Sequence, residues 1–122
     1  TSRIVTTLHA RYPHVPIIGF PRGAGAQYVD YLAQTGVHGI AIDSAMAPAW
    51  AAMQLQGAAA VQGNLDPIHL LAGGDGMERE IASIRDALGK GRFIFNLGHG
   101  VVPQTPPEHV AALVAAVRAG SH

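Results

Sequence analysis

Four polar side chains in this sequence each follow a short apolar run and stand beside glycine or another small residue: Arg22, Asp43, Asn64 and His99. Histidine can donate a hydrogen bond and changes its protonation near neutral pH. Arginine can hold an anionic group through two N–H groups. The glycines around Arg22 and His99 let a ligand approach the backbone, and the following loops offer free N–H groups where a helix begins. These residue types therefore suit a site that receives an anionic group.

The elements that must position these residues alternate along the chain. Short apolar runs without a polar alternate, typical of strands buried on both faces, lie at 15–20, 38–43, 58–62 and 92–96. Helical stretches lie at 2–12, 24–35, 47–55, 66–88 and 106–119, and most of them close on a glycine such as Gly36, Gly57, Gly89 or Gly120. Residues 73–76 (GGDG) predict a surface turn that interrupts the third of the helices lying after a strand. The sequence thus predicts an α/β fold of four parallel βα units in sheet order 1-2-3-4, with right-handed crossovers and the helices on the convex side.

Because side chains at the carboxyl ends of parallel strands converge, we expect Arg22, Asp43, Asn64 and His99 to share one rim. Each has a structural alternative. His99 can bond a neighbouring loop, and Arg22 can pair with Asp43. For Asn64 and Asp66 the sequence favours capping of the next helix.

Other conspicuous residues favour structural interpretations. Six histidines show no metal-ligand spacing and are expected on the surface or in helices: His9, His14, His38, His69, His109 and His122. Trp50 and Met53 lie three apart on one predicted helix, which indicates core packing.

Composition narrows the class of protein. With 122 residues, 48% hydrophobic and 13% charged, the chain predicts one globular unit over 1–122. Eight basic residues balance eight acidic ones, so nucleic acid is not an expected partner. The absence of cysteine excludes disulfides and thiolate metal sites. No apolar run reaches the roughly 18 residues that span a bilayer, so we expect no membrane association and a cytoplasmic location.

Three stretches carry a resemblance to a known family: GFPRGAG (19–25), VQGNLDP (61–67) and FIFNLGHGVVPQTPPEHVAALVAAV (93–117). Together they resemble the carboxyl-terminal part of uroporphyrinogen decarboxylase. The resemblance implies the last four βα units, or half, of a TIM (β/α)8 barrel. It also implies a homodimer that uses no metal or organic cofactor. Its substrate would be the tetrapyrrole uroporphyrinogen III, whose four acetate side chains lose carbon dioxide to give coproporphyrinogen III in heme biosynthesis.

The resemblance also implies roles for individual residues. His99 is the expected catalytic residue and a substrate ligand, Arg22 is expected to hold a propionate, and Asp43 and Asn64 complete the substrate-binding set. The family's arginine-rich segment and the acidic residue that holds the pyrrole N–H groups cannot be mapped onto this sequence. Ser44 stands where the family usually has tryptophan. Because Thr1 opens a helix with no preceding strand or methionine, we expect a truncated chain that is inactive alone and whose open face is either buried in a homodimer or partly disordered.

Two other functions are weighed against this one. Cobalamin-type methyltransferases of the same superfamily use a His and Cys zinc set, which a chain without cysteine cannot supply. The other alternative is a half-barrel that serves as a non-catalytic binding module.

Overall fold

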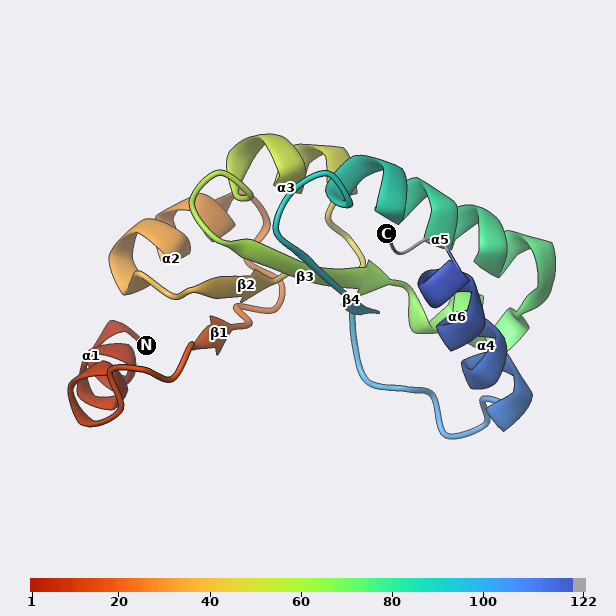
Figure 1. Cartoon of the computed structure of the whole chain (residues 1–122), viewed down its shortest axis with the longest axis horizontal. Helices are drawn as coiled ribbons and strands as arrows, with labels where there is room; N and C mark the ends of the chain where they lie inside the picture. Colours follow the sequence, from red (N-terminus) through yellow and green to blue (C-terminus); the bar gives the residue numbers. More distant parts are fainter. Residues whose placement is uncertain (120–122) are drawn as a thin grey trace.

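A computed structural model describes residues 1–119 of the chain. Four strands form one sheet, namely β1 (Ile18–Gly19), β2 (Gly39–Ala41), β3 (Ala60–Leu65) and β4 (Phe93–Leu97). They pair in parallel in the order β1-β2-β3-β4 (Figure 1). The result is an open α/β sheet consistent with half of a TIM barrel, as predicted.

The helices alternate with these strands. They are α1 (Ser2–Arg11), the 3-10 helix η1 (Gly25–Gln27), α2 (Tyr28–Thr35), α3 (Pro48–Gln54), α4 (Pro67–Ala72), α5 (Gly74–Leu88) and α6 (Pro107–Ala119). The predicted interruption of the third helix is confirmed at Gly73, whose φ of 66° separates α4 from α5. The predicted closing glycine of the last helix, Gly120, and His122 lie outside the described residues.

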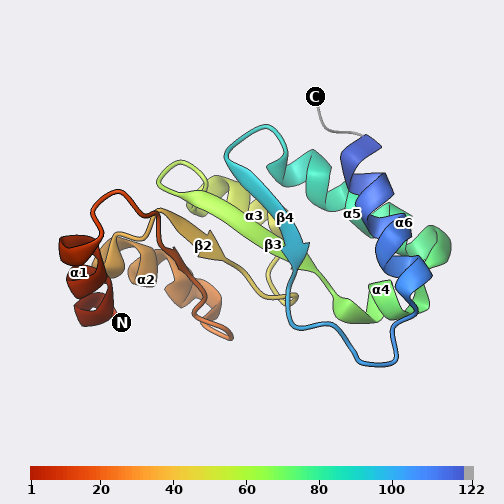
Figure 2. The same cartoon turned by 60° about the horizontal axis from the view of Figure 1, so that its bottom comes forward.

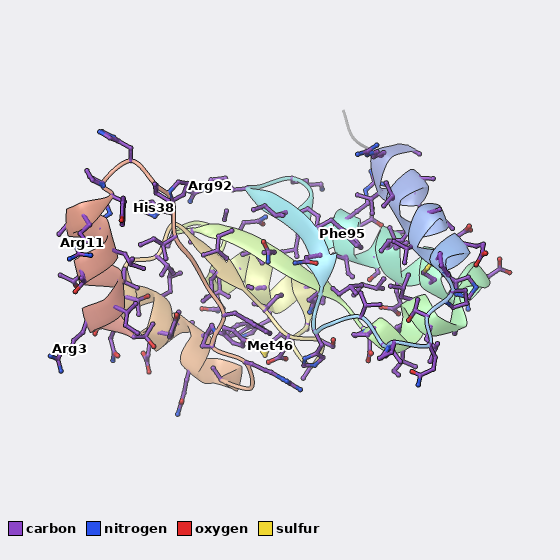
Figure 3. All side chains as sticks on the ribbon, turned by 90° about the horizontal axis from the view of Figure 1, so that it is seen from below. Arg3, Arg11, His38, Met46, Arg92 and Phe95 are labelled. Carbon is purple, nitrogen blue, oxygen red and sulfur yellow. The ribbon has the colours of Figure 1, made fainter. Side chains whose placement is uncertain are left out.

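The helices cover one face of the sheet. α2, α3 and α5 lie above the strands in Figure 1, and a buried apolar core fills the space between them. Its largest fully buried members include Tyr28, Ile40, Ile42, Leu55, Leu65, Met77, Ile81 and Leu88. The opposite face lies in front when the molecule is turned, and no helix within residues 1–119 crosses it (Figure 2, Figure 3).

The uncovered face corrects one expectation. β2 is buried throughout, as predicted for a strand covered on both faces. In β1 and β4, however, Ile18 is 45% exposed and Ile94 is 44% exposed. On β4 the neighbouring residues Phe93 and Phe95 pack against the core, so burial alternates along this strand. These two strands are the sheet edges, and the side chains on their bare face have no second layer to cover them.

Candidate functional site

The carboxyl ends of β2 and β4 meet across the end of β3. The N–H of Gly98 donates a hydrogen bond to the carbonyl of Leu65 at 2.8 Å, which continues the ladder past β4. Gly98 also lies against Ser44, and a Cβ at Gly98 would overlap the backbone and side chain of Ser44. A glycine is therefore required where the loop carrying His99 passes the loop after β2.

Asp43 is a buried carboxylate at the centre of this rim, with 4% of its surface exposed. Its Oδ2 accepts hydrogen bonds from the N–H of Gly23 at 2.7 Å and from the hydroxyl of Tyr28 at 2.8 Å, and Oδ1 accepts from the N–H of Ala45 at 3.0 Å. Burial alone would raise the pKa of Asp43, but these hydrogen bonds and the neighbouring His99 outweigh it and hold the pKa below its usual value. Asp43 is thus a stable buried anion.

Tyr28 is a functional neighbour that sequence reasoning missed. It is fully buried in the first turn of α2, and its hydroxyl also accepts a hydrogen bond from the N–H of Asp43 at 3.1 Å. Burial is the main reason that the pKa of Tyr28 is raised to about 12, so the hydroxyl stays protonated as a donor to Asp43. A tyrosine within the predicted helix at 24–35 was the signal in the sequence, because buried tyrosine hydroxyls usually find a partner.

Arg22 does not form the ion pair with Asp43 that was its structural alternative. It is exposed in the loop between β1 and η1, while the three donors to Asp43 are Gly23, Tyr28 and Ala45. The backbone of the next residue, Gly23, is what binds the carboxylate. The guanidinium of Arg22 is therefore presented to solvent at the rim.

Asn64 holds the loop after β2 in place. It lies within β3, and its Nδ2 donates to the carbonyls of Asp43 at 2.9 Å and Met46 at 2.7 Å. The capping role predicted for Asn64 is wrong, because its amide is directed across the sheet and not along the chain. Capping by Asp66 is confirmed, since its side chain accepts from the N–H of Ile68 at 3.0 Å.

His99 is half-buried in the loop after β4, close enough to Asp43 for its charge to lower the pKa of that carboxyl. Within the described part of the chain, three buried polar atoms at this rim have no hydrogen-bond partner: Nδ1 of His99, Oγ of Ser44 and Oδ1 of Asn64. Buried polar groups are usually paired, so three unpaired ones gathered at the strand ends mark this rim as unusual. The structure thus brings His99, Ser44, Asp43 and Asn64 together, with Arg22 on the adjoining loop.

Comparison with known proteins decides the family. The family model described as Uroporphyrinogen decarboxylase (URO-D) matches residues 1–120. The chain belongs to the uroporphyrinogen decarboxylase family.

Curated relatives agree with this family. Each of the following is named uroporphyrinogen decarboxylase. The protein of Rhodospirillum rubrum is 53% identical over 118 residues, which cover 97% of this chain and 34% of the relative. The protein of Granulibacter bethesdensis is 51% identical over 116 residues, which cover 95% of this chain and 34% of the relative. The protein of Gluconacetobacter diazotrophicus is 54% identical over 119 residues, which cover 97% of this chain and 33% of the relative. The chain spans about a third of the length of the curated relatives it matches, and the resemblance predicted from its motifs is confirmed.

Other residues singled out in the sequence have structural positions. His109 bonds the carbonyl of Leu70 through Nδ1 at 2.8 Å and lies against Gly73, which holds α6 to the junction of α4 and α5. His38 accepts the N–H of Ile17 at 3.0 Å beside β1. Trp50 packs partly against the core as predicted, whereas Met53 is 82% exposed, so the two do not form one buried pair.

Neither a metal centre nor a membrane-spanning helix is found within residues 1–119. No three histidine or acidic side chains there are grouped closely enough to hold a metal ion. No helix there has the length and apolar character needed to cross a membrane.

Proposed function

We propose that this chain forms the His99-bearing part of an enzyme that removes carbon dioxide from the four acetate side chains of uroporphyrinogen III to give coproporphyrinogen III. The observation that carries the proposal is the family match over residues 1–120, together with relatives named uroporphyrinogen decarboxylase that are about 50% identical in sequence. The rim geometry supports it, because unpaired polar atoms gather where a parallel sheet places its ligands.

The reaction needs a proton donor and a place for a carboxylate. Protonation of the pyrrole ring carbon adjacent to the one that bears the acetate creates a cation that is shared by the acetate-bearing carbon. The bond between the acetate methylene and its carboxyl carbon then breaks, carbon dioxide leaves, and the bonding electrons neutralise the cation. The resulting exocyclic methylene takes up a proton to become a methyl group, and the ring carbon gives its added proton back. One proton is consumed for each carbon dioxide released.

The described residues suit the binding part of this chemistry. The imidazole of His99, half-buried at the rim, can donate a hydrogen bond to an acetate carboxylate. Arg22, exposed on the adjoining loop, can hold a propionate through two N–H groups. Asp43 contributes a buried negative charge beside His99. The candidate set is therefore His99 as the catalytic donor and Arg22, Asp43 and Asn64 as its binding partners or supports.

The bare side of the sheet bears on assembly. Ile18, Phe20 and Ile94 are each close to 45% exposed. We take the chain as the carboxyl-terminal four βα units, whose open edges would be joined by the remaining units of a barrel. A homodimer of the complete enzyme and a cytoplasmic location are further parts of this proposal.

A transplant tests the function. In what we call the graft enzyme, this chain replaces the matching 118-residue segment of the Rhodospirillum rubrum protein. The graft enzyme and the isolated chain are incubated anaerobically with uroporphyrinogen III, and the oxidised products are separated by chromatography. We expect coproporphyrin from the graft enzyme and none from the isolated chain. A folded graft enzyme without turnover would favour a non-catalytic module, and turnover by the isolated chain would refute the assignment of roles.

A further inference from the structure

The short turn at residues 43–46, here called the rim turn, contacts both loops that carry the candidate ligands. The loop of Arg22 is tied to it by the hydrogen bond from Gly23 to Asp43 at 2.7 Å. The loop of His99 packs on it through Gly98, which lies against Ser44. Figure 3 shows Met46, the last residue of this turn, among the loops at the strand ends. The rim turn is therefore the common support of the two loops.

The Arg22 loop is open around its two glycines. Gly23 and Gly25 have φ values of 76° and 56°, and a Cβ at either position would meet nothing within 4 Å. The loop is thus built from residues with wide conformational freedom and little packing around them. The N–H of Ala24 donates to the carbonyl of Pro21 at 3.0 Å and Ala24 packs against the core, while the hydrogen bond from Gly23 to Asp43 is the contact that ties the loop to the rim turn.

Tyr28 fixes the carboxylate that makes this contact. Its hydroxyl donates to Oδ2 of Asp43 at 2.8 Å and accepts from the N–H of Asp43 at 3.1 Å. This reciprocal pair holds both the side-chain torsion of Asp43 and the backbone before the rim turn. The same Oδ2 receives the N–H of Gly23. Any rotation of the carboxylate would therefore move the acceptor away from the Arg22 loop.

We propose that Asp43 and Tyr28 form a positioning pair that sets the place of Arg22 relative to His99. Tyr28 is fully buried beneath the rim, so it acts through Asp43 and the loop and not by touching a ligand. The identity of the ligand as a porphyrinogen carboxylate rests on the proposed function. The fixing of the loop by the pair does not.

The loop itself gives a test that needs no turnover. Hydrogen exchange of the Gly23 amide is measured by NMR in the 122-residue chain, its Tyr28→Phe variant and a control, Tyr31→Phe. Tyr31 lies on the same helix α2, but its hydroxyl lies against Gly19 and not Asp43. We expect exchange at Gly23 to be at least about tenfold faster in Tyr28→Phe and unchanged in Tyr31→Phe. Equal exchange in the two variants would overturn the pair.

A double-mutant cycle tests whether the pair acts through Arg22. In the graft enzyme, Tyr28→Phe is expected to raise KM for uroporphyrinogen roughly 10-fold while kcat changes less, because a misplaced binding group weakens ground-state and transition-state binding together. On an Arg22→Gln background the same change is expected to raise KM by less than about twofold. Effects that multiply instead would show that Tyr28 does not work through Arg22 and would overturn the proposal.

The two tests separate the proposals. An inactive graft enzyme counts against the proposed function alone, and the exchange of Gly23 then decides the positioning pair. Melting temperatures of all variants are compared, since a general loss of folding would lower them and speed exchange at many amides besides Gly23.

Discussion

Replacing Asn64 by alanine tests the central claim about how the rim is held. Asn64 is 5% exposed, and its Nδ2 donates to the carbonyls of Asp43 and Met46. Alanine leaves both carbonyls without this donor. The Asp43 carbonyl is in a buried contact and loses its partner at a cost of about 1 to 3 kcal/mol, while the partly buried Met46 carbonyl can regain water and costs about 1 kcal/mol. We expect Asn64→Ala to lower the free energy of unfolding by about 2 to 4 kcal/mol.

Urea unfolding of the 122-residue chain, followed by circular dichroism, measures this loss, and Asn96→Ala is the matched control. Asn96 is the register partner of Asn64 on β4, but it is exposed, and its side chain only accepts the N–H of the next residue, Leu97. We expect the control to cost less than about 0.5 kcal/mol, as is usual for surface substitutions. If Asn64→Ala costs no more than Asn96→Ala, the two carbonyl contacts do not stabilise the rim and the reasoning fails.

Three further predictions concern the neighbouring residues. His99→Asn in the graft enzyme should lower kcat/KM by roughly 10- to 100-fold with the melting temperature unchanged. The reason is that the change removes a hydrogen-bond donor to a charged acceptor, worth about 1.5 to 3 kcal/mol. Unchanged kinetics would show that His99 has a structural role. The pKa of Asp43 is lowered in the fold, so the carboxyl takes up its proton at a higher pH in the unfolded chain than in the folded one. The contribution of Asp43 to the free energy of unfolding is therefore complete above about pH 5 and is lost as the pH falls below it. Asp43→Asn should lose less stability in acid than the unchanged chain, and equal losses would contradict this. Gly98→Ala should lower the free energy of unfolding in urea by more than about 2 kcal/mol, because the added Cβ overlaps Ser44. The control is Gly100→Ala, whose added Cβ meets nothing within 4 Å and which is expected to fold normally.

The arrangement of elements was predictable because buried strands and capped helices leave local patterns. The four apolar runs gave the order of the sheet, and the glycines at 73–76 gave the break between α4 and α5. Strand ends were less predictable. β3 continues to Leu65, three residues past the predicted end, because pairing with β4 extends through Asn64 despite its low strand propensity. β1 is only two residues long, shorter than the predicted run at 15–20.

The candidate site was predictable only in part. Placement at strand ends brought Asp43, Asn64 and His99 to one rim, because parallel strands share a direction. The hydrogen-bond partners of these side chains could not be predicted from the sequence. The reach of Tyr28 from α2 to Asp43, fifteen positions away, depends on how the helix packs on the sheet, and no local spacing encodes that distance. The same holds for Asn64, whose partners lie in a loop that precedes it by a whole helix.

The sheet order has a consequence for how the chain is made. Each strand pairs with the strand that comes just before it in the sequence, so no strand must wait for a partner that has not yet been synthesised. As the chain leaves the ribosome, each βα unit can dock on an edge already in place, and the loop closed at every step holds only one or two short helical elements. The newest edge is the one left exposed at each stage. Until β4 arrives, that edge is β3, the strand that carries Asn64.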